Sequence, residues 1–400
     1  MKHFKYLIIG GGLTGDAAVR GIRELDQDGT IGMFSTEPDP PYSRPALSKG
    51  LWQDKPLEKI WRKTTDRGVD LHLHDRITQL DPAKKLVTDE NGGQYSYDKL
   101  LLATGCDPIR LPFGAESIIY YRDFQDYQKL RELTKEGKEF FVIGGGFIGS
   151  EIAAALAMNG KKVTMAFLED AIGAIIYPPD LAENLNEYYR GKGVEVLAGD
   201  AVNKIEKIDN RVAIETRSGN KYAVDGVVAG IGVRPSTQLA EEAGLKIDNG
   251  IVVDEYLQTS HPDIYSAGDV ANFYHSLLKK HLRVEHEDHA LSSGKTAGRN
   301  MAGAGEKYTH VPLFYSDIFD LGYEAVGELS SKLDTQADWK EPYREGVVYY
   351  LDENGKAKGV LLWNVWDAVP AAVSILQDAD QFDKNDLTLD LLKQRMAKDA

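Results

Sequence analysis

The 400-residue sequence predicts an α/β fold with two similar parallel-sheet units and a smaller C-terminal α+β domain. The main observation is a repeat. Residues 4–25 and residues 139–167 each contain an apolar run, three consecutive glycines, one further glycine and a helix-like segment. The order strand, glycine turn, helix is typical of the start of a βαβ unit with a parallel sheet. A chain of this length is expected to form two or three domains.

The segment after each repeat has the pattern of β-hairpins. Residues 71–105 contain alternating apolar residues and an Asn91-Gly92 turn, and they end in an apolar run. This pattern predicts hairpin strands. Residues 194–232 repeat the pattern, so the chain is predicted to be a duplication.

The pattern changes from Thr309 onward, where apolar strand-like segments are followed by a helical tail. These segments predict a small antiparallel sheet and then helices. The predicted domains are residues 1–112 together with 238–308, residues 113–237, and residues 309–400.

The chain is acidic, with a formal net charge of −15 and a pI near 5.1. This charge opposes binding to nucleic acid, which requires clustered Lys and Arg side chains. One small basic group, Lys279-Lys280-His281-Leu282-Arg283, stands out, and we interpret it first as a solvated turn or hairpin.

Cys106 is the single cysteine, so no intrachain disulfide can form and a reducing compartment is favoured. The apolar run near the N-terminus is too short for a signal peptide. No stretch approaches the ~20 apolar residues needed to span a bilayer. We therefore expect a soluble, cytoplasmic protein without a membrane span. No metal site is predicted.

Both glycine turns match the pattern G-x-G-x-x-G. The first glycine permits a tight turn, the second lets a pyrophosphate approach the backbone, and the third allows close packing of helix and strand. The phosphates then lie at free N–H groups of the helix N-terminus. We assign to dinucleotide binding Gly10, Gly12 and Gly15 in the first turn, and Gly144, Gly146, Phe147, Ile148 and Gly149 in the second.

Two dinucleotide sites in one chain favour a flavin and a nicotinamide nucleotide, FAD and NAD(H), because a hydride must pass between them. Glu169 follows the second strand of the second unit. A carboxylate there accepts hydrogen bonds from a ribose 2′-OH and repels a 2′-phosphate, which favours NADH over NADPH. A strand-end glutamate without this role is the alternative. In the first unit the corresponding position falls at Thr36-Glu37, so the acid lies one residue late.

Two further apolar strands are expected to end at the first site. Residues 100–105 end in Thr104-Gly105, and residues 264–271 contain Gly268-Asp269. The Asp269 carboxylate could accept hydrogen bonds from sugar-like hydroxyls, or it could cap a helix. Gly232, at the end of residues 194–232, is also assigned to cofactor binding.

These features together resemble the two-dinucleotide flavoprotein reductases, the glutathione-reductase-like pyridine nucleotide oxidoreductases. The segment PYSRPALSKGLW is similar to the R-P-x-L-S-K segment of ferredoxin reductases and of apoptosis-inducing factor. The resemblance to the latter extends to RVEHEDHALSSGKTAGRNMAG, FYSDIFDLGYEAVGE and GVLLWNVWDAVPAA, and it covers nearly the whole chain.

The resemblance implies that Arg44 and Lys49 contact FAD, with Lys49 beneath the reactive edge of the isoalloxazine. Glu151 would pair with Lys49 and keep its ammonium charged, and that charge stabilises a flavin that gains electrons. The alternative is a surface lysine and a helix glutamate that never meet. Arg122 matches a further arginine that contacts FAD.

The resemblance also places Glu285 and His286 at the flavin and nicotinamide face, where His286 could donate a hydrogen bond or a proton. Two positions depart from apoptosis-inducing factor. Glu287 replaces a second histidine, and Tyr315, which is assigned to cofactor binding, replaces a tryptophan. The resemblance therefore does not identify the electron acceptor.

No cysteine lies in the first helix region or in residues 41–50, where the disulfide and thiol reductases of this family carry theirs. Cys106 is interpreted as structural. Electrons are therefore expected to leave the flavin directly, towards a ferredoxin- or rubredoxin-type carrier, a quinone, a small oxidant or oxygen. The group Lys279–Arg283 is a candidate docking patch for a carrier.

A second hypothesis is a redox sensor similar to apoptosis-inducing factor. In this reading, NADH forms a long-lived charge-transfer complex with the reduced flavin, and complex formation is linked to dimerisation. The sequence leaves the oligomeric state open.

Overall fold

The computed structural model describes residues 1–399, with side chains through residue 397. The chain divides into two compact units. Unit 1 comprises Met1–Ala46, Lys55–Asp107 and Val233–Pro312. Unit 2 comprises Leu47–Asp54, Pro108–Gly232 and the chain from Leu313 onward.

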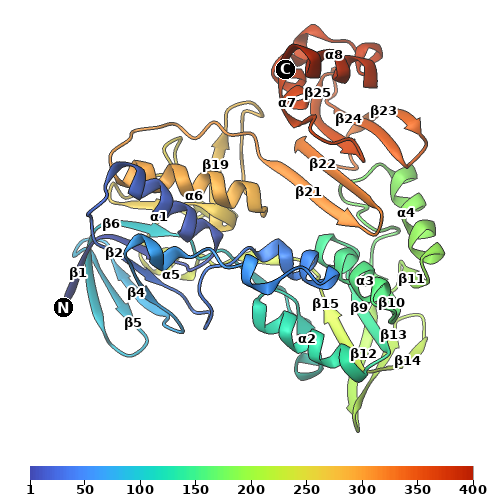
Figure 1. Ribbon diagram of the computed structural model, residues 1–400, viewed down its shortest axis with the longest axis horizontal. Coiled ribbons are helices and arrows are strands. Elements are labelled where there is room, and N and C mark those ends of the chain that lie inside the picture. Colours follow the sequence, from blue (N-terminus) through green and yellow to red (C-terminus); the bar gives the residue numbers. More distant parts are fainter. Residues whose placement is uncertain (400) are drawn as a thin grey trace. The chain divides into compact units, whose positions relative to one another are not determined.

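The main sheet of unit 1 has the order β3-β2-β1-β6-β5-β4, and β18 also pairs with β6 (Figure 1). Strands β1, β2, β3, β6 and β18 are parallel, whereas β4, β5 and β6 form antiparallel pairs. The strands are β1 (Lys2–Ile9), β2 (Ile31–Phe34), β3 (Val69–His72), β4 (Ile77–Asp81), β5 (Leu86–Asp89), β6 (Gln94–Leu102) and β18 (Ile264–Ser266).

Parallel strands covered on both faces are expected to be apolar throughout. In β1, Leu7, Ile8 and Ile9 are all buried in succession. A second, small sheet of unit 1 has the order β17-β19-β20, and β7 pairs with β16. These strands are β17 (Ile251–Val252), β19 (Ala271–His275), β20 (Lys280–Leu282), β7 (Cys106–Pro108) and β16 (Val233–Pro235).

Helices α1 (Leu13–Leu25) and α6 (Glu287–Met301) lie side by side in unit 1 (Figure 1), and α5 (Gln238–Glu242) is a short helix of the same unit. Glycines allow the close approach of α1 and α6. A Cβ on Gly21 would lie 2.1 Å from the carbonyl oxygen of Lys295, and one on Gly298 would lie 2.1 Å from that of Ala18. The two backbones are therefore in direct contact, which holds α6 against the helix that follows the first glycine turn.

Unit 2 repeats the parallel arrangement with the order β11-β10-β9-β15-β8, and a three-stranded antiparallel sheet has the order β12-β13-β14. Its helices are α2 (Phe124–Glu136), α3 (Phe147–Met158) and α4 (Pro179–Gly191). Its strands are β8 (Ile118–Tyr120), β9 (Glu139–Ile143), β10 (Lys162–Phe167), β11 (Val194–Ala198), β12 (Val202–Ile208), β13 (Arg211–Thr216), β14 (Lys221–Val224) and β15 (Gly226–Ala229).

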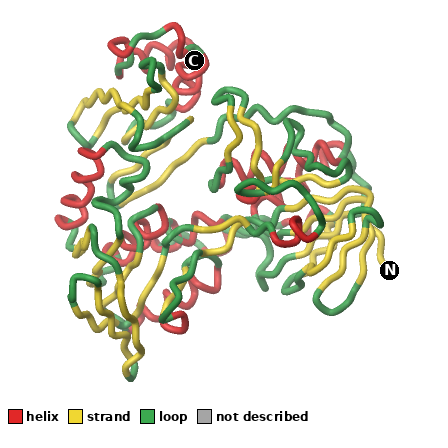
Figure 2. The backbone as a smooth tube through the Cα atoms, turned by 180° about the vertical axis from the view of Figure 1, so that it is seen from behind, coloured by secondary structure: helices red, strands yellow, loops and turns green. Residues whose placement is uncertain are grey.

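Residues from Leu313 onward form an antiparallel sheet of order β21-β22-β25-β24-β23, which is followed by two helices. The two helices lie near the end marked C (Figures 1 and 2). The elements are β21 (Leu313–Ile318), β22 (Leu321–Gly327), β23 (Asp334–Glu341), β24 (Glu345–Leu351), β25 (Ala357–Trp363), α7 (Val369–Gln377) and α8 (Leu389–Asp399).

The predicted fold class is confirmed, and so is the duplication: β3-β2-β1-β6 in unit 1 and β11-β10-β9-β15 in unit 2 have the same order. The hairpin predicted at Asn91-Gly92 is the turn between β5 and β6, where Gly92 has a φ of +84°. The predicted domain boundaries stay a proposal, and Ala400 at the end of the third domain lies outside the described residues.

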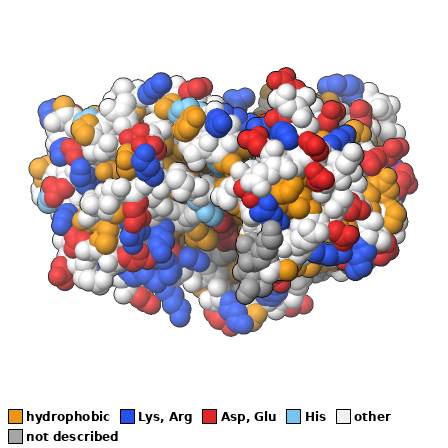
Figure 3. All heavy atoms as spheres, turned by 90° about the horizontal axis from the view of Figure 1, so that it is seen from above, with side chains coloured by type: hydrophobic (Ala, Val, Ile, Leu, Met, Phe, Trp, Pro, Cys, Tyr) orange, Lys and Arg blue, Asp and Glu red, His pale blue; other side chains and the backbone are white. Residues whose placement is uncertain are grey.

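Within residues 1–399, no helix is long and apolar enough to cross a bilayer. The same described part of the chain holds no group of three or more His, Cys, Asp and Glu side chains arranged to bind a metal ion. Figure 3 shows a face on which Lys and Arg side chains are interspersed with Asp and Glu side chains, although the net charge is −15.

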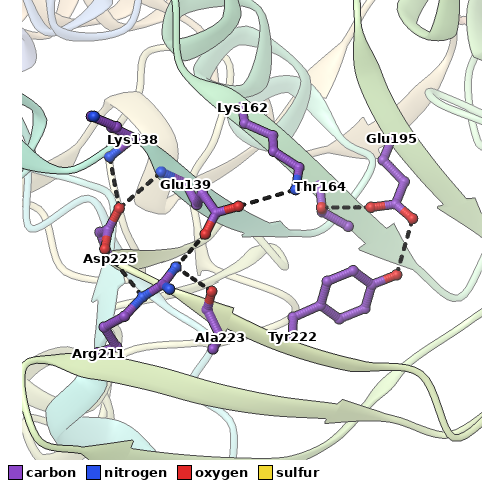
Figure 4. A network of polar contacts seen from close by, with 9 residues as sticks. All are labelled: Lys138, Glu139, Lys162, Thr164, Glu195, Arg211, Tyr222, Ala223 and Asp225. Carbon is purple, nitrogen blue, oxygen red and sulfur yellow. Dashed lines mark hydrogen bonds and ion pairs between the residues drawn. The ribbon is translucent and has the colours of Figure 1, made fainter.

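A polar network joins the start of β9 to the antiparallel sheet of unit 2 (Figure 4). The Asp225 carboxylate accepts hydrogen bonds from the backbone N–H groups of Lys138 at 2.7 Å and Glu139 at 2.9 Å. Arg211 of β13 pairs with the carboxylates of both Glu139 and Asp225. Burial raises the pKa of Asp225, but the two N–H groups and Arg211 outweigh burial and lower it below the ordinary value of 3.8.

We predict that Asp225→Ala lowers the free energy of unfolding at pH 7 by about 1 kcal/mol, because two backbone donors lose their acceptor. The folded-state pKa is depressed, so this stabilisation is present above the unfolded pKa and is lost as pH falls through the folded value. Urea unfolding at pH 7 and pH 3 checks both points. Glu116→Ala, at an exposed position, is the control. A loss that is equal at both pH values contradicts the charge-based account.

Candidate functional site

The first glycine turn connects β1 to α1 in unit 1. Gly10 has a φ of +125°, and a Cβ on it would lie 2.0 Å from the carbonyl oxygen of Ala103. A Cβ on Gly15 would lie 2.3 Å from the carbonyl oxygen of Gly10. A Cβ on Gly12, by contrast, would meet no atom within 4 Å. Gly10 and Gly15 are therefore required by the fold itself, whereas the absence of a side chain at Gly12 leaves space beside the backbone.

The second turn, between β9 and α3 in unit 2, has the same geometry. Gly144 has a φ of +111°, and a Cβ on it would lie 2.2 Å from the carbonyl oxygen of Gly230. A Cβ on Gly149 would lie 2.0 Å from the carbonyl oxygen of Gly144, while one on Gly146 would meet nothing within 4 Å. In the first turn of α3, Phe147 and Ile148 are 42% and 37% exposed.

Both turns fit a dinucleotide. Gly12 and Gly146 are the N-caps of α1 and α3, and neither helix has a side-chain hydrogen bond at its cap. The first N–H groups of each helix therefore point towards the open space beside the second glycine. This arrangement suits a pyrophosphate, which binds such groups through its oxygens and is favoured by the helix dipole.

The acidic positions after the second strands differ between the two units. Glu169 lies two residues beyond β10 and its side chain is exposed. Thr36 occupies the equivalent position after β2, and Glu37 lies one residue later, as the sequence predicts. Glu37 is held in place: its Oε1 accepts from Arg44 Nη2 at 2.6 Å and its Oε2 accepts from Tyr42 at 2.6 Å. Glu37 thus orients Arg44 within unit 1.

Two further turns end strands of unit 1. Gly105 has a φ of +69°, and Thr104 beside it donates a hydrogen bond to the Ser236 carbonyl oxygen at 2.7 Å. A Cβ on Gly268, which has a φ of +72°, would lie 2.2 Å from Thr14 Oγ1 on α1. Asp269 lies inside the 3-10 helix η6 (Gly268–Val270), whose N-cap is Ala267, so Asp269 does not cap η6, and its assignment to cofactor binding stays a prediction.

Lys49 and Glu151 meet in unit 2. Lys49 Nζ lies 2.6 Å from Glu151 Oε1, and the side chains are 14% and 4% exposed. Ser48 donates to Glu151 Oε2 at 2.6 Å, and Ser316 of β21 donates to Glu151 Oε1 at 2.5 Å. The Lys49 ammonium lies 5.5 Å from the centre of the Tyr315 ring. A buried carboxylate with three donors is fixed in orientation, and it fixes the ammonium in turn.

The surroundings of this ion pair are aromatic. Tyr189 donates a hydrogen bond to the Ser150 carbonyl oxygen at 3.0 Å, and burial raises the pKa of both Tyr189 and Tyr177 well above 10, so both stay neutral. A cavity of about 20 Å³ adjoins the pair, with Trp52, Met158 and Phe319 among its lining residues. Both side chains of the pair are largely shielded from solvent, and an electrostatic interaction there is stronger than in bulk water.

The segment that begins α6 carries the other predicted side chains of unit 1. His286 is the N-cap position of α6, and Glu285 pairs with Arg283 at 2.5 Å. Glu287 accepts a hydrogen bond from Ser43 at 2.9 Å, which joins the start of α6 to the proline-flanked segment of residues 41–50.

Two further predicted positions of unit 2 form hydrogen bonds through their backbone. The N–H of Arg122 donates to Asp126 at 2.9 Å, just before α2. The carbonyl oxygen of Gly232, which has a φ of +98°, accepts from the N–H of Ile109 at 2.9 Å. Their assignment to cofactor binding stays a prediction.

The comparisons with known proteins agree with this geometry. The family model described as pyridine nucleotide-disulphide oxidoreductase matches residues 4–294. The chain belongs to this family. A second model, described as the C-terminal region of mitochondrion-associated apoptosis-inducing factor, matches residues 297–342. The chain is accordingly an NAD(P)H-dependent flavoprotein oxidoreductase whose cofactors are FAD and NAD(H), as predicted.

Individual relatives cover nearly all of the oxidoreductase. Mitochondrial apoptosis-inducing factor 1 of Dictyostelium discoideum is 32% identical over 94% of this chain and 79% of its own length. The ferredoxin reductase subunit of 5,5'-dehydrodivanillate O-demethylase from Sphingobium is 34% identical, with 82% of each chain covered. The crystal structure of a covalent putidaredoxin reductase–putidaredoxin complex matches with a TM-score of 0.91 and 27% identity, over 100% of this chain and 99% of that chain.

Cys106 of the oxidoreductase is buried at 6% exposure. Its Sγ accepts a hydrogen bond from Arg283 Nη1 at 3.2 Å and contacts the Asp269 carbonyl oxygen at 3.4 Å. A buried thiol with these contacts suits a structural role better than that of an exposed nucleophile.

Sequence reasoning missed Ser48 and Ser316, the two hydroxyl donors to Glu151. Ser48 lies next to Lys49, and Ser316 lies next to Tyr315 in a segment that carries the family resemblance. Their adjacency to assigned residues was the available signal. Nothing in the sequence indicated that both serines donate to Glu151, because serine is common and Glu151 lies more than one hundred residues from each in the sequence.

We predict that Glu169→Ala weakens the preference of the oxidoreductase for NADH over NADPH by about tenfold, because the loss of the carboxylate removes an acceptor for the 2′-OH and a repulsion of the 2′-phosphate. Steady-state kcat/KM with both nucleotides measures the effect. Asp170→Ala, at the neighbouring exposed carboxylate, is the matched control. If the wild-type protein uses NADPH as efficiently as NADH, the assigned role of Glu169 is wrong.

Proposed function

We propose that the oxidoreductase takes electrons from NADH onto FAD and passes them directly, without a cysteine, to a protein carrier of ferredoxin or rubredoxin type, a quinone or a small oxidant. FAD, when bound, accepts two electrons from the nicotinamide and releases them singly or in pairs. The observation that supports direct exit is Cys106: it is the single cysteine of the chain, and it is buried against Arg283 and Asp269.

In this proposal the two glycine turns have different ligands. The turn at Gly10–Gly15 and the carboxylate of Asp269 hold FAD, and the turn at Gly144–Gly149 with Glu169 holds NAD(H). Gly12 and Gly146 leave open space for the two pyrophosphates. Exposed Phe147 and Ile148 offer an apolar surface to the nicotinamide nucleotide.

The proposed role of Lys49 is electrostatic. Its ammonium, fixed by Glu151, holds a positive charge where the flavin gains electrons. Ser48 and Ser316 keep the Glu151 carboxylate in one orientation, so that the ammonium does not have to reorganise during the reaction. His286, at the start of α6, supplies a hydrogen-bond donor at the nicotinamide face.

A redox sensor is the second candidate, and the match of residues 297–342 to the C-terminal region of apoptosis-inducing factor favours it. In that function NADH forms a long-lived complex with the reduced protein and promotes dimerisation, and turnover is slow. A cytoplasmic location is a separate proposal that rests on the single cysteine, which suits a reducing compartment.

Anaerobic rapid mixing with NADH followed by an acceptor separates the two candidates. For the electron-transfer function we expect an acidic ferredoxin, a rubredoxin or a neutral quinone to reoxidise the reduced protein at about 1 per second or faster. The opposite result is a long-wavelength absorbance band that persists after air is admitted, together with a dimer in gel filtration that depends on NADH. This result contradicts the electron-transfer function and supports the sensor.

A further inference from the structure

The segment that joins β10 to α4 in unit 2, residues 168–178, carries Glu169 beside the second glycine turn. The N–H of Gly173 donates to the carbonyl oxygen of Gly145 at 2.9 Å, so the segment and the turn are in direct contact. Ile175 of the same segment is 69% exposed. An exposed apolar side chain next to a glycine turn suits the face of a nucleobase, so we expect the segment to form one side of the nucleotide site.

The position of the Glu169 side chain depends on the backbone that carries it. Within the described residues, the Glu169 carboxylate forms no hydrogen bond or ion pair, and it is exposed. The carbonyl oxygen of Glu169 accepts from the N–H of Gly199 at 2.9 Å, which holds the residue on one side. The direction of the carboxylate is therefore set by this bond and by what holds the next residues of the segment.

Asn186 of α4 holds those next residues. Its Nδ2 donates to the carbonyl oxygen of Asp170 at 3.0 Å, and its Oδ1 accepts from the N–H of Ile172 at 3.0 Å. Asn186 is only 5% exposed. One buried amide thus satisfies one acceptor and one donor of the backbone, a combination that the similarly shaped side chains of Asp and Leu do not offer. The backbone directly after Glu169 is thereby held against α4.

The far end of the segment is held independently of Asn186. Tyr350 of β24 donates a hydrogen bond to the carbonyl oxygen of Ile176 at 2.8 Å. Tyr177 is buried, and its ring centre lies 5.6 Å from that of Trp363 on β25. These contacts remain when Asn186 is replaced. A replacement should therefore release the first half of the segment without unfolding all of it.

We propose that Asn186 is a positioning residue for the choice between NADH and NADPH. By holding the backbone at Asp170 and Ile172, it sets the direction in which the Glu169 carboxylate meets the ribose 2′-OH. A carboxylate that points elsewhere loses the hydrogen bond to the 2′-OH and the repulsion of a 2′-phosphate. This inference rests on the proposed role of Glu169 at the NAD(H) site and names the side chain that positions it.

The test is anaerobic rapid mixing of the full-length holoprotein with NADH or NADPH. It measures the apparent Kd and the limiting rate of flavin reduction for each nucleotide, and the ratio of the two efficiencies gives the preference. Asn186→Leu keeps the branched shape of the side chain but removes its donor and its acceptor. Asn186→Asp keeps an acceptor for the Ile172 N–H and removes the donor, and it carries the test if the Leu variant does not fold.

Asn300→Leu is the matched control for the loss of a buried amide. Asn300 lies in α6 of unit 1 and is 6% exposed. Like Asn186, it holds the backbone of another segment, because its Nδ2 donates to the carbonyl oxygens of Tyr256 and Glu306 at 2.8 Å. Its replacement should leave the preference for NADH at the wild-type value.

We expect Asn186→Leu to lower the preference for NADH by about three- to tenfold, through a higher apparent Kd for NADH and a limiting rate within about twofold of the wild type. In the Glu169→Ala background the same replacement should have no further effect on the preference. A residue that acts through Glu169 adds nothing once that carboxylate is gone.

Three results overturn the positioning role of Asn186. They are an unchanged preference in both Asn186 variants, an equal loss with and without Glu169, and an equal loss in Asn300→Leu. If Glu169→Ala itself leaves the preference unchanged, the proposed role of Glu169 fails together with that of Asn186. If NADH does not reduce the flavin of the wild type, the proposed function fails.

Discussion

Replacement of Lys49 by Met is expected to slow flavin reduction by NADH about 100-fold, the usual effect of removing one preorganised charge from a transition state. The Lys49 side chain is 14% exposed and its ammonium is fixed 2.6 Å from Glu151, so its position costs no reorganisation during the reaction. Met keeps the length and apolar stem of the side chain but removes the charge. Single-turnover absorbance under anaerobic conditions measures the rate.

The Lys49 variant needs a control for stability, because it leaves the Glu151 carboxylate buried without its cation. Breaking a buried pair on one side typically costs about 3–5 kcal/mol. The double variant Lys49→Met/Glu151→Gln removes both charges and restores a neutral hydrogen-bonded group beside Ser48 and Ser316. We expect the double variant to recover thermal stability but not the rate. If the double variant fully recovers the rate of flavin reduction, Lys49 has a structural role only.

Alanine at Gly12 and at Gly146 is expected to separate the two dinucleotide sites. A Cβ at either position meets no protein atom within 4 Å, and neither glycine has a positive φ, so the fold should tolerate both changes. The added methyl group would, however, collide with a pyrophosphate bound beside the backbone at that glycine. We expect Gly12→Ala to weaken FAD retention by about tenfold or more, and Gly146→Ala to weaken NADH binding by as much with FAD retained.

Flavin absorbance after gel filtration and NADH titration measure these two affinities. Gly191→Ala is the control, since that glycine also has open space around it but belongs to neither turn. If Gly12→Ala impairs NADH binding and Gly146→Ala impairs FAD retention, the assignment of the cofactors to the two units is reversed. If neither variant changes any affinity, the turns do not hold pyrophosphates.

The parallel sheets could be predicted because their signal is local. In each unit an apolar strand, a glycine turn and a helix follow one another within about thirty residues, and steric contacts at Gly10 and Gly144 explain why no other residue fits there. The division of the chain into units has no such local signal. Residues 41–50 read as one continuous segment, yet Ala46 belongs to unit 1 and Leu47 to unit 2.

The candidate site shows the same contrast. The pairing of Lys49 with Glu151 followed from the family resemblance, whereas the hydroxyl donors Ser48 and Ser316 depend on contacts between distant parts of the sequence. The ion pair of Arg44 with Glu37 was also missed, although both residues had been assigned to the first site. They lie in an irregular segment, where no periodicity indicates which side chains face each other.

The most direct test of the account is anaerobic stopped-flow mixing of NADH with the wild-type protein and with Cys106→Ala. We predict that NADH bleaches the visible flavin absorbance of both proteins at the same rate, and that a neutral quinone then restores it in both. If NADH does not bleach the wild type, the conclusion that NADH reduces the flavin is wrong. If NADH bleaches the wild type but not Cys106→Ala, the conclusion that electron transfer needs no cysteine is wrong.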